Sequence, residues 1–267
     1  MAGLIDRKRA RQAFQDYTDR YDSSDIKIRL KVEHTYRVAE IARRIAASLH
    51  LDEEAVDYAW LLGLLHDVGR FEQVRRFGTF VDKDSVDHAQ LGADILFKDG
   101  LIRQFVSETA LSAEQMAVAE TAIRLHNKLT LPDALEKETQ LYTDLLRDAD
   151  KVDIFHVIAE IPYEDRMGRA ATDGMEEARA SVMQCVLEHR CVPRLFERTK
   201  FEVMVSQCCM AFELVYPESI AITKEQGYLQ RLLAGQIPGS SAPWTDREQA
   251  QLAILQREID KEWALRS

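Results

Sequence analysis

Ala59-Trp60-Leu61-Leu62-Gly63-Leu64-Leu65-His66-Asp67-Val68-Gly69-Arg70 is an apolar run that ends in a histidine–aspartate pair. The run predicts a buried helix that carries the pair at its end, with Gly69 as the stop. The two polar side chains must then be hydrogen-bonded or coordinated, because an unpaired buried polar group costs about 1–3 kcal/mol. We therefore interpret His66 and Asp67 as part of a metal site.

The composition of the whole chain predicts a helical, soluble protein. It has 267 residues, 46% of them apolar, and only 11 glycines and 6 prolines, which favours long helices over many short strands. Its longest apolar run is Ala59–Leu65, and its N-terminal segment lacks the apolar middle of a signal peptide. We therefore expect an all-α, cytoplasmic protein with no membrane partner.

The charge balance limits the kinds of partner. A formal net charge of −10 argues against an extended nucleic-acid-binding face, which needs a basic footprint. A local basic cluster could still hold a small phosphorylated ligand. The four cysteines show no metal-ligand spacing, so we expect reduced and mostly buried thiols.

Periodicity and capping residues predict the remaining helices. We expect a charged helix within residues 1–25 that lies on the core. Further helices should include residues 28–49, 55–67, 88 onward, 113–126, 141–156, 175–189, 200–216 and 246 onward. Residues 70–78 should form an arginine-rich connection, and residues 238–243 a linker. As domains, we expect an N-terminal helical extension over 1–26, a metal-binding helical domain over 27–216 and a C-terminal helical extension over 217–267.

The final helix carries one apolar stripe, formed by Leu252, Leu255, Ile259 and Trp263. Such a stripe must dock on the body of the protein or on a second subunit. A homo-oligomer through the C-terminal helix is therefore one of two expected outcomes.

Four of the seven histidines lie on the inward face or at the end of an apolar helical segment: His34, His66, His88 and His126. Each of them alone would more often be a hydrogen-bonded core residue than a ligand. Together with Asp67 and an aspartate from residues 148–153, they form an imidazole and carboxylate set without thiolate, which suits Fe, Mn, Co, Ni or Zn. Helical periodicity leaves Asp148 and Asp150 equally placed. Six ligands suit two ions that share a bridging carboxylate.

Three arginines follow the histidine–aspartate pair. Arg70, Arg75 and Arg76 lie within seven positions, and a planar guanidinium matches the edge of a phosphate group. Ordinary pairing of solvated charges is the alternative, and for Arg75 and Arg76 the two interpretations weigh equally.

The order His, His-Asp, His, His, Asp over residues 28–153 resembles the HD-domain superfamily of metal-dependent phosphohydrolases. The resemblance implies an all-helical bundle with His34, His66, Asp67 and Asp150 as core metal ligands. It also implies that Asp150, which directly precedes a lysine, is the ligand that periodicity left open. His88 and His126 match the extra histidines of the binuclear branch of the superfamily, in which Asp67 would bridge two divalent transition-metal ions.

The same resemblance suggests roles for two cations. Arg70 occupies a place where many relatives carry a basic residue near the substrate, and we expect it to neutralise phosphate charge. Lys151, next to Asp150, is expected either to do the same or to pair with a carboxylate behind the ligands. We count Asp67, Arg70 and Lys151 as candidate catalytic residues, and Arg70, Arg75 and Arg76 as candidate substrate-binding residues.

The chain lacks the sequence signatures of two branches of the superfamily, which excludes the substrates of those branches. The chain lacks the Gly-Tyr-Pro signature of the cyclic-di-GMP branch, and Arg70-Phe71 stands where alarmone hydrolases carry an acidic pair. The expected function is hydrolysis of a small phosphorylated compound such as a nucleotide by a metal-activated hydroxide. Two alternatives remain open, namely an HD-fold di-iron oxygenase that cleaves a C–H or C–P bond, and a non-catalytic signalling or binding module.

Overall fold

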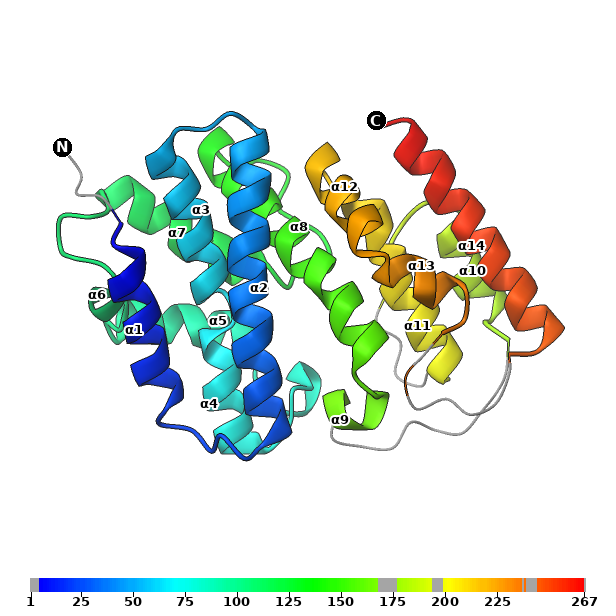
Figure 1. Ribbon diagram of the computed structural model, residues 1–267, viewed down its shortest axis with the longest axis horizontal. Helices are drawn as coiled ribbons and strands as arrows, with labels where there is room; N and C mark the ends of the chain where they lie inside the picture. The colour runs from blue at the N-terminus through cyan, green and yellow to red at the C-terminus, as the bar shows by residue number, and fades with distance from the viewer. Residues whose placement is uncertain (1–4, 168–176, 194–198, 237, 239–243, 267) are drawn as a thin grey trace. The chain divides into compact units, whose positions relative to one another are not determined.

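The computed structural model describes residues 5–167, 177–193, 199–236, 238 and 244–266, and these residues form helices and no strand (Figure 1). The predicted all-helical fold is therefore confirmed. The chain divides into two compact units, Met1–Asp150 and Lys151–Ser267. Within the described ranges, no helix combines the length and the apolar character needed to cross a bilayer.

The first unit contains α1 Arg7–Thr18, α2 Ile26–Ser48, α3 Glu53–Leu65, α4 Val68–Phe77, η1 Asp82–Asp84, α5 His88–Ala93, η2 Asp94–Lys98, α6 Ile102–Phe105, α7 Ala113–Leu125 and the first part of α8 Lys137–Glu160. Side chains of aspartate or serine accept hydrogen bonds from the first backbone N–H groups of α1, α2, α3, α5 and α7. Ser112 and Gln115 form a capping box at the start of α7.

Helices α2 and α3 pack closely and lie side by side in Figure 1. A Cβ atom at Gly63 would lie only 2.6 Å from the Cα atom of Ala39, so the two backbones meet where both residues are small. This contact fixes the C-terminal end of α3, where His66 follows, against the middle of α2.

Helices α4 and α5 approach each other even more closely. A Cβ atom at Gly69 would lie 2.2 Å from the carbonyl oxygen of His88 and 2.5 Å from the amide nitrogen of Gly92. Gly69 is therefore a packing residue in the first turn of α4, and the prediction that it ends a helix was wrong. The predicted connection over 70–78 was also wrong, because these residues continue α4 until the left-handed Gly78 ends it.

The N-terminal helix α1 lies on the core of the first unit, as expected. Phe14 and Tyr17 are buried, and their rings lie 5.8 and 5.9 Å from the ring of Phe71 in α4. The expected domain boundaries after residues 26 and 216 stay a prediction. Most of the expected 238–243 linker lies outside the described residues.

The second unit contains the end of α8 together with α9 Tyr163–Met167, α10 Ala180–Leu187, α11 Lys200–Cys208, η3 Cys209–Glu213, α12 Pro217–Gln226, α13 Tyr228–Leu233 and α14 Asp246–Ala264. Thr245 and Glu248 form a capping box at the start of α14. The apolar stripe of α14 is buried against the helices of its own unit, and Trp263 donates a hydrogen bond to the carbonyl of Ala211. The stripe thus docks on the body of the chain, and the homo-oligomer stays a prediction.

A histidine at the end of α10 ties that helix to α14. His189 Nδ1 lies 2.7 Å from a carboxylate oxygen of Glu262, and its Nε2 lies 3.2 Å from one of Glu258. Burial alone would lower the pKa of His189, but the two carboxylates outweigh it and raise that pKa above its ordinary value of 6.5. The protonated form therefore stabilises the folded state.

We expect the thermal stability that His189 supplies to be present below pH 6.5 and to be lost as the pH rises through its raised folded-state pKa. His189→Asn, which tolerates the left-handed backbone at this position, should flatten the fall in Tm between pH 6 and pH 8. Differential scanning calorimetry at several pH values measures this dependence of Tm on pH. His50→Asn, at a residue with the same left-handed backbone, should retain the slope of the wild-type protein, and an unchanged slope in His189→Asn would refute the assignment.

Candidate metal centre

Six predicted ligand residues from six different helices or helix ends meet in one buried cluster of the first unit. His34 lies in the middle of α2, His66 at the C-terminal end of α3, Asp67 at the N-terminal end of α4, His88 at the first position of α5, His126 at the C-terminal end of α7, and Asp150 in α8. The four histidines and Asp67 are buried, and the Asp150 side chain is 15% exposed. The tertiary fold thus brings together residues up to 116 positions apart in the sequence.

The two carboxylate oxygens of Asp67 face different histidine pairs. Its Oδ2 lies 3.5 Å from His34 Nε2 and 3.4 Å from His66 Nε2. Its Oδ1 lies 3.5 Å from His88 Nε2 and 3.8 Å from His126 Nε2. Asp67 therefore stands between two groups of nitrogen donors.

Asp150 joins the group on the Oδ2 side of Asp67. Its Oδ1 lies 3.1 Å from His34 Nε2 and 3.7 Å from His66 Nε2. The groups His34–His66–Asp150 and His66–Asp67–His126 each bring one ligand atom per residue within 4.8 Å of the others. Asp148 is fully buried but belongs to neither group, so the structure separates the two aspartates that periodicity could not.

Hydrogen bonds on the other ring nitrogen aim three of the imidazoles inward. His66 Nδ1 lies 2.7 Å from the carbonyl of Gly63, and His126 Nδ1 lies 2.7 Å from the carbonyl of Ile123. A carbonyl only accepts, so each Nδ1 carries the proton and each neutral ring presents the lone pair of Nε2. His88 is held in the same way by the carboxylate of Asp82, 2.8 Å from its Nδ1.

The spacing of these nitrogens fits a shared cation. His66 and His34 Nε2 are 3.3 Å apart, and His88 and His126 Nε2 are 3.1 Å apart. Two nitrogens bound about 2.1 Å from one ion at ordinary angles lie about 3.0–3.4 Å from each other. Lone pairs that face each other at this distance repel unless a proton or a cation lies between them.

An orphaned oxygen supports the same interpretation. Asp67 Oδ1 is buried and has no hydrogen-bond partner among the described residues, although the neighbouring histidine nitrogens surround it. A buried carboxylate oxygen without a partner is costly, and a divalent cation would satisfy it. The residues present therefore fit a metal ion of the kind that takes nitrogen and oxygen ligands.

The pKa shifts of two carboxylates and one imidazole in the cluster also suit metal binding, which needs ionised carboxylates and neutral imidazoles. Burial alone would raise the pKa of Asp67, but the Lys31 ammonium and the His66 imidazole lower it well below its ordinary value. His34 and His66 likewise outweigh burial and lower the pKa of Asp150. Burial, helped by the Arg70 guanidinium, lowers the pKa of His88 to about 3.

Asp82 was not predicted from the sequence, and its carboxylate contacts His88 through Nδ1, the ring nitrogen opposite the one that faces Asp67. The Asp82 carboxylate contacts His88 Nδ1, accepts hydrogen bonds from Arg70 and Gln73, and lies six residues before the histidine. Burial would raise its pKa, but His88 and Arg70 lower it well below its ordinary value. The only sequence signal was an aspartate in an acidic stretch, which does not show where its carboxylate points.

We expect Asp82→Asn to weaken divalent-metal binding about 10–100-fold, because His88 loses the carboxylate that orients it. Titration of metal-free protein with Mn²⁺ or Co²⁺ measures the affinity. Asp84→Asn is the matched control in the same 3₁₀ turn, since the Asp84 carboxylate belongs to none of the possible metal-ligand groups. The metal affinity of this variant should equal that of the wild type. Equal affinity in Asp82→Asn would show that His88 needs no such partner.

Two further residues escaped the sequence analysis. Arg147 of α8 donates hydrogen bonds to the carbonyls of Leu125 and His126, where α7 ends, and so fixes the backbone that carries His126. Lys31, one turn before His34 on α2, places its ammonium 2.5 Å from Asp67 Oδ2. Neither a lysine nor an arginine in a helical pattern signals such a contact.

The basic residues that the sequence singled out divide into two kinds. Arg70 is largely buried, and its guanidinium contacts Asp82 at 2.9 Å and approaches Asp67 Oδ1 to 3.6 Å. The exposed side chains of Arg75 and Arg76 both pair with Glu72, and Lys151 pairs with Glu213 at 3.1 Å in the second unit. A role in substrate binding or catalysis for any of these four residues stays a prediction.

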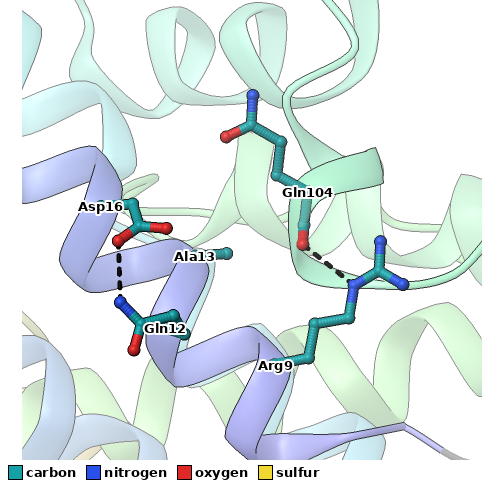
Figure 2. Close-up of a pocket in the computed structure, with 5 residues that line it drawn as sticks. All are labelled: Arg9, Gln12, Ala13, Asp16 and Gln104. Atoms are coloured by element: carbon teal, nitrogen blue, oxygen red, sulfur yellow. Dashed lines mark hydrogen bonds between the residues drawn. The ribbon is translucent and has the colours of Figure 1, made fainter.

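A shallow hollow on the first unit lies elsewhere. Arg9, Gln12, Ala13, Asp16 and Gln104 line it between α1 and α6, and Figure 2 shows Arg9 against the backbone carbonyl of Gln104. The hollow shares no residue with the histidine cluster. Its arginine is occupied by the carbonyls at the end of α6, so the contact holds α1 in place.

Comparison with known proteins gives one match. The family described as the HD domain matches residues 32–177, which is more than half of the chain and includes all six clustered residues. No curated protein and no solved structure matches the chain.

Proposed function

The chain belongs to the HD-domain family, whose members are typically metal-dependent phosphohydrolases, and we propose that it hydrolyses a small phosphorylated compound such as a nucleotide. The observation that carries the proposal is the position of Asp67, whose two oxygens each face a pair of histidine nitrogens. This arrangement supports a binuclear centre in which Asp67 bridges two divalent ions.

The ligand sets divide naturally between the two ions. His34, His66 and Asp150 would hold one ion with Asp67 Oδ2, and His88 and His126 would hold the other with Asp67 Oδ1. The second set has fewer protein ligands, so it leaves more positions for water or substrate. Only nitrogen and oxygen donors take part, which favours Fe, Mn, Co, Ni or Zn.

The charge of such a centre favours an anionic substrate. Two divalent ions bring four positive charges, and the carboxylates of Asp67 and Asp150 neutralise two of them. Neutral imidazoles add none, so the buried centre keeps an excess of about two positive charges, which suits a phosphate dianion.

The bound ions would supply a hydroxide at neutral pH and would polarise the phosphoryl oxygens. Asp67 would fix the separation of the ions, while the hydrogen bonds to Gly63, Ile123 and Asp82 keep three imidazoles aimed at them. Arg70 would neutralise charge on the phosphoryl group, because its buried Nε has no hydrogen-bond partner among the described residues.

A panel of phosphomonoesters, dinucleotides and cyclic nucleotides, assayed with Mn²⁺, Co²⁺, Ni²⁺, Fe²⁺ and Mg²⁺, tests the proposal. Release of phosphate or nucleotide under anaerobic conditions, abolished by a chelator and restored by metal, is the expected result. Turnover that requires O₂ and fails on every phosphoester would instead identify an oxygenase. A protein that binds no metal would refute both enzymatic functions.

A further inference from the structure

The Lys31 ammonium occupies the edge of the cluster where a metal ion is expected. Its nitrogen lies 2.5 Å from Asp67 Oδ2, and the lysine side chain is 20% exposed, whereas Asp67 is 2% exposed. The same oxygen faces the Nε2 atoms of His34 and His66. One carboxylate oxygen is thus shared between a lysine and the nitrogens of a proposed metal site.

A divalent ion held by His34, His66 and Asp67 Oδ2 would be an immediate neighbour of this ammonium. Both are cations that compete for the lone pairs of one oxygen, and at such a separation their repulsion in a buried site is large. The ion and the ammonium therefore do not share Oδ2 at equal strength. Binding of the ion favours a position of Lys31 away from the carboxylate.

In the position beside Asp67, the lysine ammonium already has a second neighbour, the Phe80 ring. Its ammonium lies 5.7 Å from the centre of the Phe80 ring, and the Arg70 guanidinium lies 5.6 Å from the centre of the same ring. An aromatic ring within about 6 Å attracts a cation. The flexible four-carbon stem of a lysine lets its ammonium move by several ångströms without moving the helix.

We propose that Lys31 is a built-in cation of the site: it neutralises Asp67 in the metal-free protein, is displaced from Oδ2 by the metal ion, and then stays with Arg70 beside Phe80 to bind the substrate's phosphoryl group. This inference rests on the proposed metal-dependent phosphohydrolase function. It makes Lys31 of α2 a second anion-binding residue, in addition to Arg70 of α4.

A permanent structural ion pair between Lys31 and Asp67 is the competing interpretation. It predicts that loss of the lysine leaves Asp67 disordered and weakens metal binding. Displacement predicts the reverse, because loss of the lysine removes a competitor of the metal.

Metal affinity of Lys31→Met, measured by calorimetric titration of metal-free protein with Mn²⁺ alone, distinguishes the two. We expect the first Mn²⁺ to bind about tenfold more tightly than in the wild type, since no ammonium has to leave Oδ2. The Tm of metal-free Lys31→Met should fall, while the Tm of the Mn²⁺-loaded variant should equal that of the loaded wild type. Lys31→Arg keeps the positive charge and should bind Mn²⁺ no more tightly than the wild type.

Inorganic phosphate tests the second half of the proposal. Phosphate should bind Mn²⁺-loaded Lys31→Met about tenfold more weakly than the loaded wild type, because one of two cations beside Phe80 is missing. Lys27→Met is the matched control, since Lys27 lies one turn earlier on α2 and pairs with Asp25, outside the cluster. Lys27→Met should match the wild type in both the Mn²⁺ and the phosphate titration. If Lys31→Met does not fold, Lys31→Gln provides a second neutral variant.

The outcomes separate this inference from the proposed function. Unchanged or weaker Mn²⁺ binding in a folded neutral variant, or unchanged phosphate binding, would overturn the role of Lys31 while the metal centre stands. A wild-type protein that binds no Mn²⁺, Co²⁺, Ni²⁺, Fe²⁺ or Zn²⁺ would overturn the proposed function itself.

Discussion

Asp67→Ala should leave the purified protein without a bound metal pair and should lower phosphohydrolase turnover at least about a thousandfold. Among the described residues, Asp67 is the one side chain whose two oxygens face both histidine pairs, so its loss removes a ligand from each proposed ion at once. Metal analysis by mass spectrometry and a phosphate-release assay measure the two effects.

A matched carboxylate separates this loss from a general loss of stability. Asp57 of α3 is largely buried and pairs with Arg7, but it lies outside the cluster. Asp57→Ala should lower the free energy of unfolding while the metal content stays that of the wild type. If Asp67→Ala kept its metal content, the carboxylate would not be a bridge, and the centre would have to be assigned differently.

Gly69→Ala should destabilise the protein by about 3 kcal/mol and weaken metal binding as well. The new Cβ would lie 2.2 Å from the carbonyl oxygen of His88 and 2.5 Å from the nitrogen of Gly92, and backbone atoms cannot turn aside as a side chain can. Helix α4 would have to move away from α5, which separates Asp67 from His88. Urea unfolding and Mn²⁺ titration measure the two consequences.

Gly78→Ala in the same helix is the contrasting variant. Apart from its chain neighbours, no described residue places an atom within 4 Å of a Cβ at this position, so the substitution costs only the strain of a left-handed backbone at φ 65°, about 1 kcal/mol. Its metal affinity should equal that of the wild type. Equal destabilisation by the two alanines would mean that the α4–α5 contact is not as tight as the structure indicates.

The sequence predicted the helical fold because its signals were local. Apolar periodicity and caps such as Asp52, Ser112 and Thr245 mark helices without reference to the rest of the chain. The failure at residues 70–78 has a physical reason as well. A glycine near the end of an apolar run usually marks a stop, whereas Gly69 is required here by the distant backbone of α5.

The sequence allowed the candidate metal ligands to be predicted, but not the side chains that contact those ligands. Histidines at the ends of apolar stripes indicated ligands, and the resemblance to HD domains selected Asp150, which the structure places beside His34. Asp82 and Lys31 could not be found in this way, because their roles depend on which atoms the fold brings beside His88 and Asp67. Such contacts carry no periodic signature.

The number of metal ions per chain tests the two-ion centre most directly. Metal-free protein titrated with Co²⁺ and then freed of excess metal should retain two ions per chain, and His126→Ala should retain about one, because it removes a ligand only from the Oδ1 side of Asp67. A wild-type protein that retains a single ion or none, or a His126→Ala variant that still retains two, would contradict the account.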